Sequence, residues 1–511
     1  MNKSRLSNSR RQVIFNKDAF PSLAIRLEML ACRSVLLYFV AFSILVSAKR
    51  GLRSTKFPDG FLWGVSTSAF QIEGAADLYG RGLSQWDEFT FKPDTIKDNS
   101  TANITTDHYH HFKEDIMLLK QLKVKSYRLS FSWSRILPLG TTDEINIEGV
   151  AFYDNLINAL ILNNIEPMVT LYHWDLPLSL AHRGGWLNRD TVDAFRRYAE
   201  FCFAQFGDRV KKWITINEPY IELNQGYCSR VQIFAPGYSQ DHCYWAYFLG
   251  SYHLLLAHGY AAQVYKTLFQ RRQQGIIGIS LFAAWYEPSN SSSQVDQLGS
   301  HLLIASGLDL FLQPIFGFSG GYPTLLKERI GARLPTLTQS ETELLKRSAD
   351  FLGINYYYTM LAREITSELS NITQIEKKFR VQEILKPSKY KAEFDNPNEF
   401  VDVFRFMRNK YGNITLFVTE NGCPDAKGEG LKDKSRIRYL RAHIRAVAKA
   451  ITEGSDIRGY FAWSLLDNFE WSSGYTDKFG LFAVDFNDPE RRRTPKRSSK
   501  WFAKLARSNR I

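Results

Sequence analysis

The stretch WITINEPY, residues 213–220, decides the fold. Apolar and β-branched residues run up to Ile216, and the chain then continues with an amide, a carboxylate and a proline, which ends a strand. A carboxylate directly after a buried strand, here Glu218, is costly to desolvate unless the fold needs it there. Taken alone, the motif favours a surface turn, with Pro219 ending the strand and Glu218 in water. The rest of the chain has to separate these two interpretations.

Seven further runs have the character of buried strands, and they alternate with amphipathic segments. The expected strands are 61–71, 126–133, 167–174, 212–217, 276–285, 351–358, 414–421 and 457–465, and the clearest helices are 110–122, 154–164, 192–207 and 435–452. Alternating β and α units predict a parallel sheet covered by helices. Eight such units favour a single (β/α)8 TIM barrel, an α/β fold with elaborated βα loops, over residues 55–505.

A doubly wound open sheet is the alternative to the barrel. Its nucleotide-binding versions are disfavoured, because no GxGxxG follows the first strand and no Walker loop is present. Longer polar insertions near 288–300 and 363–400 are expected to decorate the rim of the barrel.

The net charge of +13 is concentrated at the two ends of the 511-residue chain. Residues 1–48 carry +5 and residues 490–511 carry +8, so that the body between them is neutral. A neutral body argues against nucleic acid as a partner. The final residues, 506–511, are interpreted as a basic tail.

The N-terminus has the pattern of a secretion signal. The apolar run VLLYFVAFSILVSA, residues 35–48, follows Arg33 and ends in small residues, as at a signal-peptidase site. A start at Met29 gives a signal peptide over 29–48, and residues 1–28 are then an over-extended gene start or a long leader. We expect a secreted protein, with a lysosomal location as a variant, and no stable membrane span after cleavage. An uncleaved anchor is the alternative.

Secretion predicts glycosylation sites and few, paired cysteines. Five Asn-x-Ser/Thr sequons are present, at Asn99, Asn103, Asn290, Asn371 and Asn413. Four cysteines lie beyond the leader: Cys202, Cys228, Cys243 and Cys423. Cys228 and Cys243 flank one loop and could form a disulfide, although four cysteines allow three connectivities. No His or Cys cluster has metal-ligand spacing, so we expect neither a metal site nor a cofactor.

Polar and aromatic side chains collect where the expected strands end, which in a (β/α)8 barrel is the functional face. These residues are Gln71, Arg128, His173, Trp174, Asn217, Glu218, Asn355, Tyr357, Glu420, Trp463, Glu470 and Trp471. Each of them alone has an ordinary explanation as a core or ion-pair residue. Together, hydroxyl-binding amides and carboxylates with stacking indoles suit a neutral, polyhydroxylated ligand better than a phosphate.

Two of these carboxylates, Glu218 and Glu420, follow the fourth and seventh strands. A pair of carboxyl groups on either side of a glycosidic bond is sufficient to hydrolyse it, provided that one is protonated and the other ionised. Asn217 beside Glu218, and Arg128 inside the barrel, offer a means of separating the two pKa values.

At this point the chain resembles glycoside hydrolase family 1, the β-glucosidase group. The segments that carry the resemblance are FPDGFLWGVSTSAFQIEG (57–74), YRLSFSWSRILP (127–138), TLYHWDLP (170–177), TINEP (215–219), FLGINYYYT (351–359), VTENG (418–422) and WSLLDNFEWSSGYTDKFGL (463–481). The resemblance implies a β-glycosidase for terminal β-D-glucosides, and possible β-galactosides or β-fucosides, as small-molecule or oligosaccharide substrates.

The resemblance also implies roles for residues. Glu218 would be the acid/base and Glu420 the nucleophile of a retaining mechanism, with carboxyl groups about 5 to 5.5 Å apart. The residues implied to bind the sugar are Gln71, His173, Trp174, Asn217, Asn355, Tyr357, Trp463, Glu470, Trp471 and Phe479. Arg128 and Tyr357 would support Glu420, although NYYYT has one tyrosine more than the usual motif, which leaves the choice among 356–358 open. A cis bond between Trp463 and Ser464 is a further expectation.

Other functions of such a barrel remain open. A thioglucosidase that keeps its acid/base glutamate and a transglycosidase share these residues. A non-catalytic, klotho-like binding protein would lack one catalytic glutamate, and Glu218 and Glu420 are both present. Phospho-glycosidases replace the FEW segment, which here is intact at 469–471. The sequence does not identify the aglycone.

Overall fold

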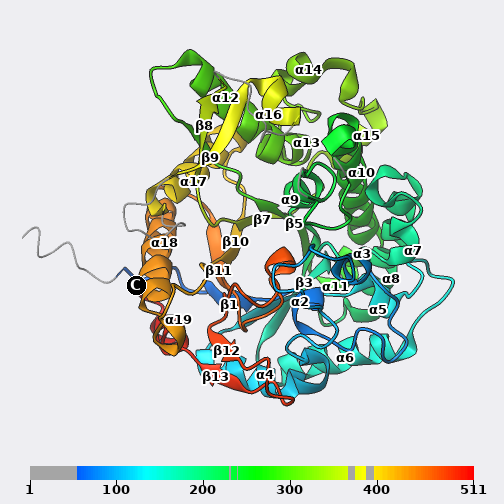
Figure 1. Ribbon diagram of the computed structural model, residues 1–511, viewed down its shortest axis with the longest axis vertical. Coiled ribbons are helices and arrows are strands. Elements are labelled where there is room, and N and C mark those ends of the chain that lie inside the picture. The colour runs from blue at the N-terminus through cyan, green and yellow to red at the C-terminus, as the bar shows by residue number, and fades with distance from the viewer. Residues whose placement is uncertain (1–54, 230–231, 239, 366–373, 387–395) are drawn as a thin grey trace, which may run out of the picture. The chain divides into compact units, whose positions relative to one another are not determined.

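The computed structural model describes residues 55–229, 232–238, 240–365, 374–386 and 396–511 (Figure 1). The expected signal peptide, the residues before it and the sequon at Asn371 lie outside these ranges. The expectations about them stay predictions.

Eight parallel strands close into a barrel in the order β1-β11-β10-β7-β5-β4-β3-β2. The strands are β1 (Leu62–Ser66), β2 (Ser126–Ser130), β3 (Glu166–Tyr172), β4 (Lys212–Asn217), β5 (Ile276–Phe282), β7 (Phe351–Asn355), β10 (Leu416–Asn421) and β11 (Ile457–Trp463). All eight expected strands are therefore present, and β1 pairs with β11, which closes the sheet and excludes the open alternative.

Six strands, β1, β2, β3, β5, β7 and β11, end two to five residues earlier than the sequence pattern predicted. β1 stops at Ser66 instead of continuing to 71, and β2 stops at Ser130 instead of 133. The ends of these two strands contact each other. The Ser130 hydroxyl accepts a hydrogen bond from the backbone N–H of Ala69 at 2.7 Å, where the chain turns into a short helix. That turn takes Gln71 off the strand and places it on the helix, above the end of the barrel.

Helices surround the barrel, and the four amphipathic segments identified in the sequence are among them (Figure 1). The helices are α2 (Ala69–Ile72), α3 (Gln85–Thr90), α4 (His108–Leu122), α5 (Trp133–Ile136), α6 (Ile147–Leu162), α7 (Leu178–Ala181), α8 (Asp190–Phe206), α9 (Pro219–Ile221), α10 (Cys243–Val264), α11 (Gln270–Gln273), α12 (Gln294–Ile304), α13 (Leu310–Phe316), α14 (Thr324–Ile330), α15 (Gln339–Leu345), α16 (Gln374–Phe379), α17 (Pro397–Tyr411), α18 (Lys434–Thr452) and α19 (Arg497–Ser508). In α8, for example, Phe195, Tyr198 and Phe203 are fully buried on one face.

The polar insertions form structure of their own. Strands β6 (Tyr286–Pro288), β8 (Met360–Glu364) and β9 (Val381–Leu385) make a three-stranded sheet beside the barrel. β12 (Phe482–Val484) and β13 (Arg493–Pro495) make a two-stranded one. Among the described residues, the helical stretch Gln294–Phe316 has the length and hydropathy of a membrane span, but 83% of its apolar window is buried inside the fold, as in a core helix.

The barrel interior is filled by a layer of large apolar side chains below the strand ends. Met168, Ile214, Phe351, Phe417 and Phe461 form this cluster and are at most 2% exposed. The layer makes the barrel a packed core with no pore, as is usual for the fold. Polar side chains can therefore reach solvent or a ligand only at the end of the barrel above it.

The last residues of the chain are not a separate tail. α19 continues to Ser508, and Asn509 then ties the end of the chain to the residues before β1. The Asn509 side chain accepts a hydrogen bond from Trp63 Nε1 at 2.9 Å, and its carbonyl accepts one from Phe57 N at 3.0 Å. Residues 506–511 consequently belong to the outer layer of the barrel.

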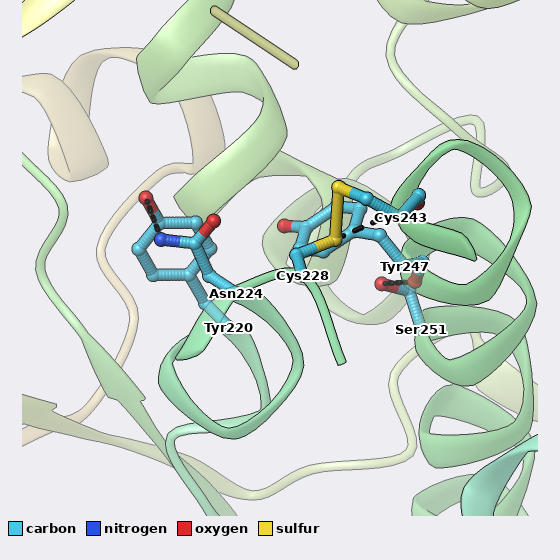
Figure 2. Close-up of a disulfide and its surroundings, with 6 residues drawn as sticks. All are labelled: Tyr220, Asn224, Cys228, Cys243, Tyr247 and Ser251. Carbon is cyan, nitrogen blue, oxygen red and sulfur yellow. Dashed lines mark hydrogen bonds between the residues drawn. A yellow bond between two sulfur atoms is a disulfide. The ribbon is translucent and has the colours of Figure 1, made fainter. Parts of the chain in front are cut away.

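A disulfide joins Cys228 to Cys243, as the sequence suggested (Figure 2). It connects the segment that follows α9 to the first residue of α10 and closes a loop with a sequence separation of 15 residues. Phe234, within that loop, packs against Trp174 and Trp471. The disulfide thereby restrains a segment that contributes an aromatic ring to the mouth of the barrel.

Candidate active site

Glu218 occupies a turn that the barrel imposes. It follows the last residue of β4 and has a φ of +45°, a conformation that is uncommon for any residue other than glycine. Pro219 is the first residue of α9, a position that suits proline because no backbone N–H is needed there. The Glu218 N–H donates to the carbonyl of Ser280 on β5 at 2.8 Å. Only 4% of Glu218 is exposed, so the surface-turn interpretation is wrong.

Glu420, in β10, is equally buried but has different neighbours. Its Oε1 forms an ion pair with Nη1 of the fully buried Arg128, and its Oε2 accepts a hydrogen bond from the Tyr357 hydroxyl at 2.7 Å. A guanidinium and a hydroxyl donor both stabilise an ionised carboxylate. The fold thus surrounds Glu420 with groups that favour its negative charge.

Glu218 has the opposite environment. Burial, and then the negative charge of Glu420, raise the pKa of Glu218 well above its ordinary value. Its one described hydrogen bond partner is neutral: Asn355 Nδ2 donates to Glu218 Oε1 at 2.6 Å. Burial and the charge of Glu420 therefore favour the protonated form of Glu218, while Arg128 and Tyr357 surround Glu420 with groups that stabilise a negative charge.

An amide links the two carboxyl groups. Asn217 Oδ1 accepts from Arg128 Nη2 at 2.7 Å and from Asn355 Nδ2 at 3.0 Å. These two donors fix the orientation of the Asn217 amide, so its Nδ2 faces His173 Nε2, 3.1 Å away. Trp174 Nε1 donates to the carbonyl of the same asparagine at 2.9 Å.

The orientation of Asn217 determines where His173 carries its proton. Because Asn217 Nδ2 donates to Nε2 of the imidazole, the ring proton lies on Nδ1. Burial, and then the nearby Arg128, lower the pKa of His173 well below its ordinary value, so that the ring is neutral. The Nδ1 atom has no hydrogen-bond partner among the described residues, and an N–H at this position is available to a sugar hydroxyl.

Two hydroxyl groups that the sequence analysis did not single out hold Asn355 in place. Thr419 Oγ1 and Ser280 Oγ donate to Asn355 Oδ1 at 2.6 and 3.0 Å, which leaves the Nδ2 group for Glu218 and Asn217. Both are fully buried within barrel strands. A hydroxyl residue inside an otherwise apolar strand was the signal by which they could have been recognised.

A second cluster of polar residues lies where the chain leaves the barrel after β11. Gln71 Nε2 donates to the Phe469 carbonyl at 3.0 Å, to Asn468 Oδ1 at 3.0 Å and to Glu470 Oε2 at 3.3 Å. Burial, followed by the negative charge of Glu420, raises the pKa of Glu470 to about 8. The Trp463 indole also hydrogen-bonds Glu470, so that Gln71, Trp463 and Glu470 form one cluster.

Aromatic rings surround these polar groups. The His173 ring lies nearly parallel to Trp463 and Trp471, with ring centroids 6.0 Å apart in both cases. Trp174 and Trp471 have positive φ angles of 74° and 51°, which are sparsely populated for large side chains and mark a constrained site. The expected cis bond between Trp463 and Ser464 is present.

The structure decides which of the three consecutive tyrosines faces Glu420. Tyr357 does, and its ring also contacts the edge of Phe479, with centroids 6.2 Å apart. Tyr356 points to the other side of the strand, where its hydroxyl donates to the Asn396 carbonyl at 2.8 Å. Tyr357 is thus the tyrosine whose hydroxyl contacts Glu420, and the predicted site residues gather at one end of the barrel.

Comparison with known protein families identifies one match over most of the chain. The model of glycosyl hydrolase family 1 matches residues 53–511. β-Glucosidase 42 of Arabidopsis thaliana is 41% identical over 471 residues, which cover 89% of this chain and 95% of the relative. β-Glucosidase 4 of Oryza sativa subsp. japonica is 39% identical over 467 residues, or 89% of this chain and 95% of that relative.

Solved structures agree with the sequence matches. A rice β-glucosidase mutant in a covalent complex with Glc superimposes with a TM-score of 0.82 at 35% identity, over 88% of this chain and 99% of that chain. An aphid myrosinase matches with the same TM-score, identity and coverage. A β-glucosidase from Thermotoga maritima in complex with castanospermine has a TM-score of 0.79 at 35% identity, over 89% and 99% of the two chains.

Proposed function

Because the chain belongs to glycosyl hydrolase family 1 and is an O-glycosyl hydrolase of the β-glucosidase type, we propose that it hydrolyses terminal β-D-glucosides with retention of configuration. β-Galactosides and β-fucosides are proposed as further substrates. One observation carries the mechanism: two equally buried carboxyl groups have opposite surroundings, which favour the protonated form of Glu218 and the ionised form of Glu420.

In the first proposed step, the Glu420 carboxylate attacks the anomeric carbon of the sugar, and the bond from this carbon to the leaving oxygen breaks. Glu218 transfers its proton to that oxygen, so that the aglycone departs as a neutral alcohol. The negative charge on Glu420 is consumed as the glycosyl ester forms. Loss of this charge lowers the pKa of Glu218, since Glu420 is the second cause of its elevation.

In the second proposed step, Glu218 acts as a base. Because its pKa is now lower, Glu218 stays ionised after the first step. It can then accept a proton from the water molecule that attacks the anomeric carbon from the face the aglycone left. The ester bond breaks, Glu420 recovers its negative charge and its ion pair with Arg128, and Glu218 regains a proton. The two inversions together give a product with the original β configuration.

The residues around the two carboxyl groups are proposed to bind the sugar ring. His173 offers its Nδ1–H, and Gln71 and Glu470 offer hydrogen-bonding groups, to neighbouring sugar hydroxyls. Trp463 is proposed to stack on the ring face, and Asn217 to contact the 2-hydroxyl. The roles of Trp174, Trp471, Asn355 and Phe479 as binding residues are part of the same proposal.

Secretion is proposed as well, on the basis of the N-terminal apolar run. The Cys228–Cys243 disulfide supports it, since such bonds persist mainly in oxidising compartments. The sequons within the described ranges offer a second support. Asn99, Asn103, Asn290 and Asn413 are all exposed and therefore accessible to glycosylation.

A thioglucosidase is the second candidate function, and the structural likeness to an aphid myrosinase favours it. A transglycosidase would use the same glycosyl ester and differ only in the acceptor that resolves it. Both activities depend on the loops around the aglycone. The products distinguish each of them from the hydrolysis of O-glucosides.

The test is to follow the products formed from methyl β-D-glucoside, p-nitrophenyl β-D-glucoside, the corresponding α-glucoside and a β-thioglucoside. Proton NMR during the first turnovers should show β-glucose before it equilibrates with the α anomer, and the α-glucoside should be inert. Initial release of α-glucose would refute retention. Faster cleavage of the thioglucoside than of both β-O-glucosides would favour the thioglucosidase.

A further inference from the structure

A continuous basic stripe runs along the exposed face of α18. Its members recur every three or four residues, which places them on one face of the helix. They are Lys434, Arg438, Arg441, Arg445 and Lys449, all exposed. No acidic residue occurs anywhere in α18. At 1.5 Å per residue the stripe is about 22 Å long, with a cation about every 5 to 6 Å.

α19 adds a second stripe beside the first. Arg497, Lys500, Lys504 and Arg507 are exposed, follow the same spacing, and again have no acidic residue within their helix. The two helices pack against each other (Figure 1). The guanidinium of Arg441 on α18 lies 5.7 Å from the ring centre of Trp501 on α19, which sets the two stripes next to one another.

These nine cations are almost uncompensated within the described ranges. The one carboxylate paired with any of them is Glu453, whose Oε1 lies 4.0 Å from Lys449 Nζ. Elsewhere on the surface the basic residues Arg405, Arg209 and Lys386 have close carboxylate partners. Other exposed cations, such as Arg271, Arg272 and Lys327, also lack a described carboxylate partner. What distinguishes α18 and α19 is that their cations follow one another along two adjacent helix faces with no acidic residue in either helix.

The stripes oppose folding more than they assist it. Like charges three or four residues apart on a helix repel each other, and Lys434 lies at the helix N-terminus, where the helix dipole disfavours a cation. Among the described residues, Arg441 over the Trp501 ring and Lys449 beside Glu453 are the contacts that offset this repulsion. An arrangement that costs stability and is only partly offset within the chain suggests an external ligand.

We infer that the paired stripes of α18 and α19 form a binding site for a linear polyanionic polysaccharide, one whose sugars carry carboxylate or sulfate groups. The repeat of about 5 to 6 Å along a helix face is close to the length of one sugar residue, so successive anionic sugars can meet successive cations. Arginine in particular can bind carboxylate or sulfate through two parallel hydrogen bonds.

The composition of the surface disfavours other polyanions. An anionic membrane surface is usually bound with apolar or aromatic anchors, yet no large hydrophobic residue of α18 or α19 is exposed. Single-stranded nucleic acid needs exposed aromatic rings for stacking, and Trp501 is half-buried under Arg441. A polysaccharide requires neither feature.

The site lies on the wall of the barrel, away from its mouth. α18 connects the end of β10 to the start of β11, and helices of this kind form the outer ring of the fold. None of the nine residues belongs to the site around Glu218 and Glu420. A polysaccharide bound here would retain the enzyme on an acidic matrix while the active site stays open to its substrate.

The experiment measures binding of the full chain to immobilised polygalacturonate and dextran sulfate, with neutral dextran as the reference. The stripe variant carries Arg438→Glu, Arg445→Glu and Lys504→Glu, three residues with no described carboxylate partner. The control variant carries Arg271→Glu, Arg272→Glu and Lys327→Glu, three exposed residues outside the stripes. Both variants change the net charge equally, and unchanged cleavage of p-nitrophenyl β-D-glucoside verifies that each is folded.

We expect the stripe variant to bind at least about tenfold more weakly at about 0.1 M salt, with a shallower dependence on salt, and the control variant to bind as the wild type does. Equal weakening in both variants would show a net-charge effect and overturn the site. No binding of the wild type to either polysaccharide at about 0.15 M salt would overturn it too. Tighter binding to phosphatidylserine vesicles or duplex DNA would refute the assigned ligand class.

Discussion

The ends of β4 and β10 present the same chemical group in the same degree of burial, and yet the surroundings of the two groups differ. Glu218 and Glu420 are each 4% exposed. At the end of β10 a guanidinium and a phenol surround the carboxylate, whereas at the end of β4 its described partner is a neutral amide. Burial disfavours the charged form of any carboxyl group, so the neighbours must create the difference between the two.

The comparison indicates how two like carboxyl groups come to have the opposite surroundings that the proposed mechanism requires. Arg128 sits between the two strand ends, but it forms its ion pair with Glu420 and contacts Glu218 only through Asn217 and Asn355. The negative charge so fixed on Glu420 then helps to keep the proton on Glu218. The following changes test this asymmetry, beginning with the largest expected effect.

Glu420→Gln removes the carboxylate that is proposed as the nucleophile and whose negative charge helps to raise the pKa of Glu218. We expect the rate of glucoside hydrolysis to fall by about 10⁴-fold or more for every leaving group, because no covalent ester can form. Steady-state kinetics with p-nitrophenyl and methyl β-D-glucosides measure this. An external nucleophile such as azide should restore part of the activity and give an α-glycosyl product. A loss confined to the methyl glucoside would contradict the assignment.

Glu218→Gln should affect only the proton transfer. We expect a loss of about 10²- to 10⁴-fold with methyl β-D-glucoside and a much smaller loss in ester formation from p-nitrophenyl β-D-glucoside, whose leaving group needs little protonation. The wild type should lose activity as pH rises through the elevated pKa of Glu218, since the acid is then deprotonated. Persistence of this alkaline decline in the variant would assign the decline to another group.

Tyr357→Phe should weaken the environment of Glu420 while leaving Arg128 in place. The lost hydrogen bond is to a charged group, which is worth about 1.5 to 3 kcal/mol, or roughly 10- to 150-fold in rate. kcat should fall more than KM rises, because the hydroxyl acts on the nucleophile. Tyr356→Phe is the matched control, since its hydroxyl bonds the Asn396 carbonyl instead. Equal effects of the two changes would refute the role of Tyr357.

Glu222→Gln should leave the activity unchanged and alter stability. Glu222 lies four residues after Glu218, is fully buried, and has a pKa raised to about 8 by burial. The Tyr172 hydroxyl donates to its Oε1, and its Oε2 has no partner among the described residues. No proposed catalytic residue pairs with Glu222 as Glu420 does with Glu218. We therefore expect its elevated pKa to lower the stability of the fold as pH rises without contributing to catalysis.

Proton linkage gives the direction in which the raised pKa of Glu222 changes the stability of the fold with pH. Between a pKa of about 4.5 in the unfolded chain and about 8 in the fold, the unfolded state has lost the proton that the native state keeps. Wild-type stability should therefore fall with rising pH by up to about 1.4 kcal/mol per pH unit from this group. Urea unfolding at pH 5 and 7.5 should show a smaller fall in the variant. Identical falls in both proteins would contradict the expectation.

The sequence by itself determined the number and order of the barrel strands and the end of the barrel at which the site lies. Periodicity identified all eight strands because each is a continuous apolar run, and the polar residue that ends each run marks where the buried layer stops. The positions of Glu218 and Glu420 at the ends of two strands drew attention to the pair, and the resemblance of TINEP and VTENG to glycoside hydrolase family 1 implied their roles. The sequence also favoured the Cys228–Cys243 pair, through its position on either side of one loop.

Only the tertiary structure decided which partners these groups have. Ser280 and Thr419 are 139 residues apart and meet at Asn355. No local pattern encodes such a contact. The shortening of β1 at Ser66 and the sheet formed by the rim insertions likewise depend on neighbours from distant segments. The electrostatic environment of a group depends on which groups lie near it in space, whatever their separation in the sequence. The sequence could therefore name the two carboxyl groups, but only the closed barrel, by bringing Arg128 to one of them, gave the two groups opposite electrostatic surroundings.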